Sequence, residues 1–300
     1  IQKLYEALNG RNAKSLKAAQ SYNQCYAKYK MVGLTLETRP DWVTEEEIKK
    51  MREYGCTRVE LGVQSLYDDV LDTSNRGHRI DATIRATKML KDAGFKINYH
   101  MMLNLPGSNP KKDTMMFKEL FSNPDFRPDM LKIYPCMVIK GTKLYELWKS
   151  GKYKPYTDRQ LINIIKKTKQ YVPEYCRIVR VIRDIPAESI EAGSKTSNLR
   201  QTIHEEMKKE GLGCRCIRCR EIGNAKITTR NLKLKRLDYD ASDGKEIFLS
   251  YEDTKHDKLV ALLRLRICLE SRSLNIKNNA IIREVHTYGE SVPLFRDRDS

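Results

Sequence analysis

Long apolar runs are absent from this 300-residue sequence. A helix that crosses a bilayer needs about 20 consecutive apolar residues, and no stretch of the chain approaches that length. A secretory leader, with its basic start and short apolar core, is not seen either. From these absences we expect a cytoplasmic protein with no membrane partner.

A disulfide framework is also missing. Eight cysteines are present, but five are isolated and three are packed between residues 214 and 219. Small secreted domains carry cysteines that pair up to staple a small core. The observed spacing instead predicts free thiols in a reducing compartment, with one cluster set apart from the rest.

Acidic residues are outnumbered: 39 Asp and Glu stand against 56 Lys and Arg, which gives a net charge of +17. Twelve basic and three acidic residues lie between Lys140 and Arg183, and eight basic and one acidic residue lie between Cys214 and Arg236. Such clustering favours a nucleic-acid partner over a merely solvated surface. The candidate RNA-binding residues are Lys149, Lys152, Lys154, Arg215, Arg218, Arg220 and Lys226.

The stretch 34–65 contains two apolar strands that end in polar residues. Glu37 and Arg39 end the first, while the second carries Glu60 and ends at Gln64. Short apolar runs are typical of buried parallel strands, and sites in β/α barrels form at the C-terminal ends of such strands. These four side chains are therefore candidates for lining a site. The alternative is that Glu37 and Arg39 simply pair with each other.

Two further polar residues, His100 and Lys132, interrupt apolar strands. A lone histidine in a strand is more often a satisfied core residue than a functional one. A lysine in the middle of a parallel strand is harder to explain, because a buried ammonium group needs an anion. With Glu60 and Gln64, these residues can line one concave polar site. His100 and Lys132 are therefore further candidates for this site.

Strands and helices alternate in the first part of the chain, which predicts an α/β fold with a parallel sheet or an open β/α barrel. After Pro186 the pattern changes, and from Lys226 onward it predicts antiparallel hairpins. We expect a barrel at 1–186, a helix and linker at 187–223, and a second domain at 224–300. The expected barrel strands lie at 32–36, 59–63, 96–102, 130–134 and 177–182.

The cluster CRCIRC is the strongest single signal. Cys214, Cys216 and Cys219 can bind one zinc ion, which takes four ligands in closed structural sites. His204, on the preceding predicted helix, is the favoured fourth ligand, and Cys176 is a competitor. The alternative is three free thiols.

Arginines alternate with these cysteines, at Arg215, Arg218 and Arg220. A folded metal loop would hold them rigid and pointing outward, ready for bidentate contacts with phosphate. The lysines named above would extend the same face across the domain junction.

Many motifs follow one another in an order that resembles the catalytic subunit of Elongator. The family joins a radical S-adenosylmethionine domain to a GNAT-like α+β acetyltransferase domain, and the resemblance runs from about Leu4 to Pro293. The CRCIRC form is similar to archaeal or bacterial members. The motifs are GLTLETRPD, GCTRVELGVQS, NRGH, YHMMLNLPGS, DFRPDMLKIYP, GTKLYELWKSGKYKPY, RDIPAESI, NLRQ, CRCIRCREIG, FLSYED and LLRLR.

The resemblance implies an enzyme that modifies the wobble uridine of tRNA at carbon 5. In the family, acetyl-CoA supplies the carboxymethyl carbons and a 5′-deoxyadenosyl radical couples them to the base. The cofactor carries the hard chemistry, and the fold positions it. The implied cofactors are S-adenosylmethionine, a [4Fe–4S] cluster and zinc, with acetyl-CoA as co-substrate. The resemblance further implies that His100 and Lys132 are catalytic residues. The implied cofactor-binding residues are Glu37, Arg39, Glu60 and Gln64. A homodimer or accessory subunits are left open.

Two segments of the family pattern have no counterpart in this sequence. The three-cysteine motif that holds the [4Fe–4S] cluster would precede the first strand, and the glycine-rich CoA loop would follow Pro293. The chain begins at Ile1 rather than Met, so we expect a segment upstream. Residues 1–300 alone are expected to be inactive.

Two other functions compete with tRNA modification. One is a protein or histone lysine acetyltransferase, which would need a peptide groove and would not explain the basic clusters. The other is a non-catalytic RNA-binding scaffold. Iron content separates the scaffold from the enzyme, and the stimulating substrate separates the two enzymes.

Overall fold

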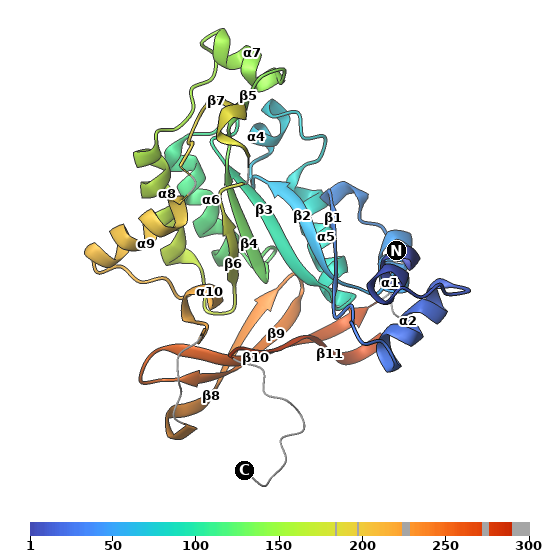
Figure 1. The fold of residues 1–300 in the computed structure, drawn as a ribbon. Helices are drawn as coiled ribbons and strands as arrows, with labels where there is room; N and C mark the ends of the chain where they lie inside the picture. Colours follow the sequence, from blue (N-terminus) through green and yellow to red (C-terminus); the bar gives the residue numbers. More distant parts are fainter. Residues whose placement is uncertain (184, 197, 224–228, 272–275, 290–300) are drawn as a thin grey trace.

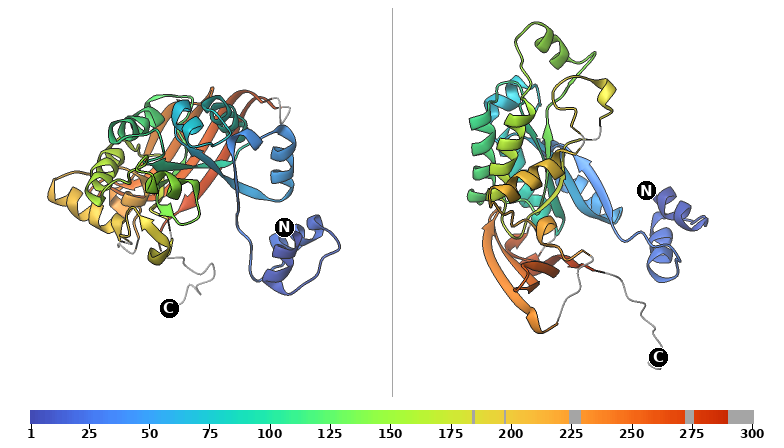
Figure 2. Two further views of the ribbon diagram at one scale, coloured as in Figure 1. Left: turned by 90° about the horizontal axis from the view of Figure 1, so that it is seen from above. Right: turned by 60° about the vertical axis from the view of Figure 1, so that its left-hand side comes forward.

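The computed structural model describes residues 1–183, 185–196, 198–223, 229–271 and 276–289. Within these residues, a five-stranded parallel sheet covered by helices stands on a four-stranded antiparallel sheet (Figure 1). A small helical lobe projects from the edge of the parallel sheet (Figure 2). No helix in the described ranges is both long enough and apolar enough to cross a bilayer.

The parallel sheet has the strand order β1-β2-β3-β4-β6. All neighbouring pairs in it are parallel. The central strands are almost completely buried, which is why they read as near-continuous apolar runs. The open β/α barrel is thus confirmed. Its strands are β1 (Leu34–Thr38), β2 (Cys56–Gln64), β3 (Lys96–Leu103), β4 (Met130–Pro135) and β6 (Arg177–Val181).

Helices return the chain between successive strands and cover one face of the sheet (Figure 2). In the last of them, Leu161, Ile164 and Ile165 are buried, and a capping box of Thr157 and Gln160 satisfies the first amides. Parallel strands joined in this way place all their C-terminal ends on one side. The helices are α3 (Glu45–Glu53), α4 (Asp68–Thr73), α5 (Ile80–Asp92), α6 (Pro110–Ser122) and α8 (Asp158–Tyr171).

The end of the barrel at the strand C-termini carries extra elements. Strand β5 (Val138–Ile139) pairs antiparallel with β7 (Ile190–Ala192). Helix α7 (Lys143–Lys149) extends beyond them, at the top of Figure 1. Short 3₁₀ helices at Pro40–Trp42 and Ala187–Ser189 complete this end.

The N-terminal lobe consists of two helices, α1 (Gln2–Asn9) and α2 (Leu16–Cys25). The sequence pattern predicts helix throughout residues 1–30. The structure instead breaks the helix at Gly10, which has a φ of 59°. Glycine adopts this left-handed conformation without the steric penalty of a Cβ atom, so it ends α1. Ser15 then caps α2 through its side chain.

The antiparallel sheet lies at the opposite end of the barrel, with the strand order β11-β10-β9-β8. Helix α9 (Leu199–Lys209), helix α10 (Ile217–Arg220) and a 3₁₀ helix at Thr229–Asn231 lead to it. The predicted boundary at residue 224 lies outside the described residues, so the division into domains stays a prediction. The strands are β8 (Leu232–Ala241), β9 (Gly244–Asp253), β10 (Lys258–Ser271) and β11 (Ile276–Thr287).

Buried ion pairs join this sheet to the base of the barrel. Both Nη atoms of Arg283 donate to the Asp129 carboxylate at 2.6 Å. Arg266 donates to Asp92 at 2.7 Å and to Glu246 at 3.1 Å. The two guanidinium side chains are fully buried, and a buried charge is tolerated only when it is paired. The position of the sheet is therefore tied to these carboxylates.

Candidate active site and metal centre

Glu60 is the centre of a polar cluster on the inner face of the sheet. Its side chain is 5% exposed. One carboxylate oxygen contacts His100 Nε2 at 2.6 Å and accepts a hydrogen bond from Lys132 Nζ. The other accepts from Asn98 Nδ2 at 3.1 Å. The strand register explains the meeting, because Glu60 lies beside Asn98 on β3 and His100 lies beside Lys132 on β4.

The electrostatics of the cluster keep Glu60 ionised. Burial raises the pKa of Glu60, but hydrogen bonds from His100 and Lys132 outweigh burial and lower the pKa to about 2. The Lys132 ammonium group thus has its anion. Glu37, whose side chain is 65% exposed, lies 3.4 Å from His100 Nδ1. His100 therefore connects a buried carboxylate to one that solvent reaches.

Glu37 and Arg39 do not pair with each other. Glu37 approaches His100, whereas Arg39 donates to both carboxylate oxygens of Asp41. The alternative that the two residues simply form an ion pair is therefore wrong. Arg39 lies beside Gly77, so it borders the residues Arg76 and His78.

A second polar cluster, formed by Gln64, Arg76 and His78, lies at the C-terminal end of β2. Gln64 has a φ of 69°, and Arg76 Nη2 donates to the Gly62 carbonyl at 3.3 Å. Burial and the charge of Arg76 lower the pKa of His78, so its ring is neutral at pH 7.

Three buried polar atoms in this cluster have no hydrogen-bond partner among the described residues: Gln64 Oε1, Arg76 Nε and His78 Nδ1. Buried polar groups are normally paired, so three unpaired atoms together at a strand end make this cluster a candidate ligand site. Sequence reasoning selected Gln64 but missed Arg76 and His78. The polar loop NRGH after the second strand was the signal that could have found them.

Three predicted RNA-binding lysines lie in and after α7, at the same end of the barrel. Lys149, Lys152 and Lys154 are exposed. Between the last two, Tyr153 is buried and its hydroxyl donates to the Asn104 carbonyl at 2.9 Å. The alternation places the aromatic ring inside and the ammonium groups outside, on a segment that is fixed to the turn after β3.

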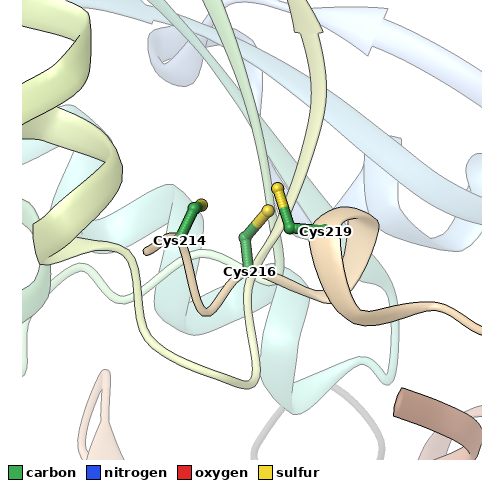
Figure 3. A group of neighbouring side chains, drawn as sticks. All are labelled: Cys214, Cys216 and Cys219. Atoms are coloured by element: carbon green, nitrogen blue, oxygen red, sulfur yellow. The ribbon is translucent and has the colours of Figure 1, made fainter. Parts of the chain in front are cut away.

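Three thiols gather at the opposite end of the barrel (Figure 3). The sulfur atoms of Cys214, Cys216 and Cys219 lie within 4.8 Å of one another. Buried Lys169 donates to Cys219 Sγ at 3.6 Å. Hydrogen bonds from the Cys214 and Cys219 thiols hold the pKa of Cys216 well below its ordinary value. Three converging cysteine side chains of this kind suit zinc, which binds cysteine as the thiolate.

The structure does not bring His204 to the three thiols. His204 is exposed, because the inward face of α9 is occupied by Leu199, Ile203 and Met207. The competitor Cys176 is fully buried nearby, and its carbonyl accepts a hydrogen bond from the Ile217 amide at 3.0 Å. Neither residue belongs to the close group formed by the three sulfur atoms. The prediction of His204 as the fourth ligand is corrected by its outward position.

The arginines of the cysteine loop do not all point outward. Arg220 is 2% exposed and donates to the carbonyls of Arg215 and Glu174 at 2.9 and 3.1 Å. The prediction that it binds RNA is wrong, because the helical turn of α10 directs its side chain into the junction. Arg215 and Arg218 are about half exposed. Lys226, also predicted to bind RNA, lies outside the described residues.

The two basic regions do not form one face. Lys149 lies on α7 beyond the strand C-termini, whereas Arg218 lies on α10 at the other end of the barrel (Figure 1). The single surface expected across the junction is therefore two separate surfaces.

The fold and two family models define the class. The model for the radical SAM superfamily matches residues 8–118, and the model for the radical SAM C-terminal domain matches residues 128–209. The chain therefore has a radical SAM β/α barrel.

Proteins that are similar over almost the whole chain indicate which radical SAM family it resembles. The chain is 47% identical to a protein named tRNA uridine(34) acetyltransferase in Methanocaldococcus jannaschii, over 99% of the chain and 56% of that protein. It is 44% identical to Elongator complex protein 3 of Saccharomyces cerevisiae, over 98% of the chain and 54% of that protein. The chain thus spans just over half the length of these two relatives.

A solved structure agrees with these relatives. The archaeal Elp3 of Methanocaldococcus infernus, with an N-terminal deletion, superposes with a TM-score of 0.94 at 47% identity. The match covers 99% of this chain and 71% of that one. The chain belongs to the Elongator complex protein 3 family.

Proposed function

We propose that this chain is the radical SAM part of an enzyme that modifies the wobble uridine of tRNA at carbon 5. The reaction would join a carboxymethyl group, derived from acetyl-CoA, to the base. The buried Glu60–His100–Lys132 cluster carries the proposal, because its carboxylate holds an imidazole and an ammonium group in fixed positions on the inner face of a radical SAM barrel. The names of the relatives supply the substrate class.

The orphan polar atoms at the end of β2 fit S-adenosylmethionine, whose amino-acid part and ribose present both donors and acceptors. Gln64 and Arg76 would hold it, with Glu37 and Arg39 at the border of the site. When bound and reduced, S-adenosylmethionine supplies a 5′-deoxyadenosyl radical.

The chain's own groups would orient and protect the reacting partners. Glu60 fixes the Lys132 ammonium and the His100 ring by direct contacts. Lys132 keeps further N–H groups for a negative or carbonyl oxygen of the substrate. His100 would exchange a proton with Glu37, which is exposed to solvent. These roles need positioned groups and a site from which water is excluded.

The cysteines in the described residues do not fit a [4Fe–4S] cluster at this site. The three that gather do so at the base of the barrel, at the start of β6. The glycine-rich CoA loop is expected beyond Pro293, outside the described residues. The thiols at the base fit a structural zinc instead, held by Cys214, Cys216 and Cys219 at the junction.

The substrate base must reach the barrel interior. Nucleotides of an anticodon loop are unpaired, so extruding one is inexpensive. Lys149, Lys152 and Lys154 would position the phosphates around the entrance, while base recognition would occur inside.

The test uses the complete natural protein, including any residues beyond 1–300, reconstituted with iron and sulfide without oxygen. It is given tRNA, acetyl-CoA and S-adenosylmethionine, and the digested nucleosides are analysed by mass spectrometry. We expect 5-carboxymethyluridine at the wobble position. Glu60→Gln should lower its formation at least about 100-fold, because the charge that holds both catalytic candidates is lost. The matched control Glu45→Gln, an exposed carboxylate on α3, should retain activity.

Three outcomes would contradict the proposal. Acetyl-CoA turnover stimulated by histone peptides but not by tRNA would indicate a protein acetyltransferase. A complete protein that binds tRNA but holds no iron would indicate an RNA-binding scaffold. Equal activity of Glu60→Gln and Glu45→Gln would remove the cluster from the mechanism.

A further inference from the structure

The N-terminal lobe, residues 1–33, is strongly basic and is not used by the proposed chemistry. Its only acidic residue, Glu6, is buried and accepts hydrogen bonds from Gln2 Nε2 and the Ala13 amide, both at 2.9 Å. Glu6 therefore serves the lobe's own folding, and its carboxylate also pairs with Lys3 at 3.1 Å. The basic residues, all of them exposed, are Lys3, Arg11, Lys14, Lys17, Lys28 and Lys30.

Aromatic rings are exposed between these charges. Tyr26 is 78% exposed and Tyr29 is 58% exposed, although a tyrosine usually hides most of its ring. Tyr22 lies on the same side of α2, with its ring centroid 6.2 Å from that of Tyr26. The guanidinium group of Arg11 covers the Tyr22 ring at 4.3 Å. The Lys28 ammonium group lies 5.3 Å from the centre of the Tyr29 ring, so both pairs of residues bring a cation next to a ring.

The backbone that carries the exposed rings is held firmly. Asn9 makes two hydrogen bonds to the backbone of Tyr29, through its amide nitrogen at 2.8 Å and its oxygen at 3.1 Å. Asn23 holds Met31 in the same way, at 3.1 and 2.7 Å. Both asparagines clamp a segment whose side chains face solvent. Rings on a fixed backbone lose little conformational entropy when a ligand stacks on them.

A cleft of about 300 Å³ lies beside Tyr22 and does not include Tyr26 or Tyr29 in its lining. Its aromatic and charged lining residues are Tyr5, Glu6, Arg11, Lys14 and Tyr22. The lobe is attached to α3 through hydrogen bonds from Tyr5 to the Tyr54 carbonyl and from Gln20 to the Glu53 carbonyl. It stands away from α7 and the barrel entrance (Figure 2). Any partner held here is therefore contacted at a distance from the reacting base.

We propose that the N-terminal lobe binds unpaired nucleotides of the RNA substrate, by stacking bases on Tyr26 and Tyr29 and pairing phosphates with the neighbouring lysines. Positive grooves with aromatic platforms are the common way of binding single-stranded nucleic acid. An acidic protein would satisfy the charges, but it would not need rigid exposed rings. The inference rests on RNA being the substrate of the proposed function.

The experiment measures binding of a fluorescent single-stranded oligouridine and of a duplex RNA to the chain. Tyr26→Leu with Tyr29→Leu should weaken binding of the single strand about five-fold or more for each stacking interaction removed, and leave duplex binding unchanged. Lys28→Gln with Lys30→Gln should lower the slope of log affinity against log salt by roughly 1.4. The aromatic control is Tyr171→Leu, on the surface of α8.

The charge control is Lys111→Gln with Lys118→Gln, two exposed lysines of α6. If the lobe variants bind oligouridine as the unsubstituted chain does, or if that chain does not bind it, the inference is overturned. If Tyr26→Leu with Tyr29→Leu weakens single-strand and duplex binding equally, the proposed stacking of bases on these rings is overturned. Formation of modified uridine is measured in a separate assay. A failure of the proposed enzyme activity can therefore be distinguished from a failure of RNA binding by the lobe.

Discussion

Replacing Glu60 by glutamine tests whether the buried charge cluster is as tightly coupled as its geometry indicates. The side chain keeps its shape but loses the negative charge beside Lys132, whose side chain is 17% exposed. Removing one partner of a buried pair costs about 3–5 kcal/mol. The lowering of the Glu60 pKa from 4.5 to about 2 corresponds to on the order of 2–3 kcal/mol, after allowance for the partial solvent contact of Lys132.

The pH dependence of the free energy of unfolding also reports on the Glu60 charge. A carboxylate whose pKa is lowered by folding stabilises the protein above its unfolded pKa, and this stability is lost as pH falls through the folded pKa. The stability difference between the unsubstituted chain and Glu60→Gln should therefore be full at pH 7 and shrink between pH 4.5 and about 2.

Urea unfolding at several pH values, followed by circular dichroism, measures both effects. Glu45→Gln is the control, because substitution of an exposed carboxylate should change the free energy of unfolding by less than about 0.5 kcal/mol. A Glu60→Gln cost below about 1 kcal/mol, or a cost that does not change with pH, would refute the reasoning.

Four further perturbations test other parts of the structure. Asp129→Asn should destabilise the chain by about 2 kcal/mol or more in urea unfolding, because it removes the negative carboxylate that accepts both Nη hydrogen bonds of buried Arg283 and leaves that arginine with Glu246 alone; a value near zero would contradict this. Cys216→Ser should abolish zinc binding in metal analysis, and unchanged zinc content would end the assignment. Arg215→Ala with Arg218→Ala should weaken tRNA binding and reduce its salt slope by roughly 0.7–0.9 for each phosphate that is no longer neutralised; an unchanged slope would place tRNA elsewhere. Gln64→Ala should weaken S-adenosylmethionine binding by the complete protein, and unaltered binding would show that Gln64 does not bind the cofactor.

The chain pairs buried charges both inside the barrel and at its base. On the inner face, Glu60 is paired with a lysine and a histidine. At the base, Arg283 and Asp129 join the antiparallel sheet to the barrel, with no exposure to solvent. Buried pairs add little net stability compared with apolar packing, but they penalise misplacement strongly. Their use at the junction is consistent with a requirement for one relative position of the two sheets.

Several corrections came from side-chain direction, which residue type alone does not give. Arg218 and Arg220 lie two residues apart in α10, yet Arg220 is buried and Arg218 is half exposed. His204 has the ligand chemistry for zinc, but the apolar stripe of α9 sends it to solvent. Local spacing therefore identified the three cysteines, because their cluster forms within six residues. It did not identify the fourth zinc ligand or the exposed arginines, because these depend on how distant helices pack.

The alternation of strands and helices, the thiol cluster and the polar ends of the strands could all be predicted from local sequence. Each of these depends on interactions within about ten residues, which hydrophobic period and capping chemistry encode directly. Only the tertiary structure decided that Glu60 contacts both His100 and Lys132, and that the two basic regions lie at opposite ends. Those outcomes depend on strand register and domain docking, because contacts between residues far apart in the chain are set by the packing of the whole core.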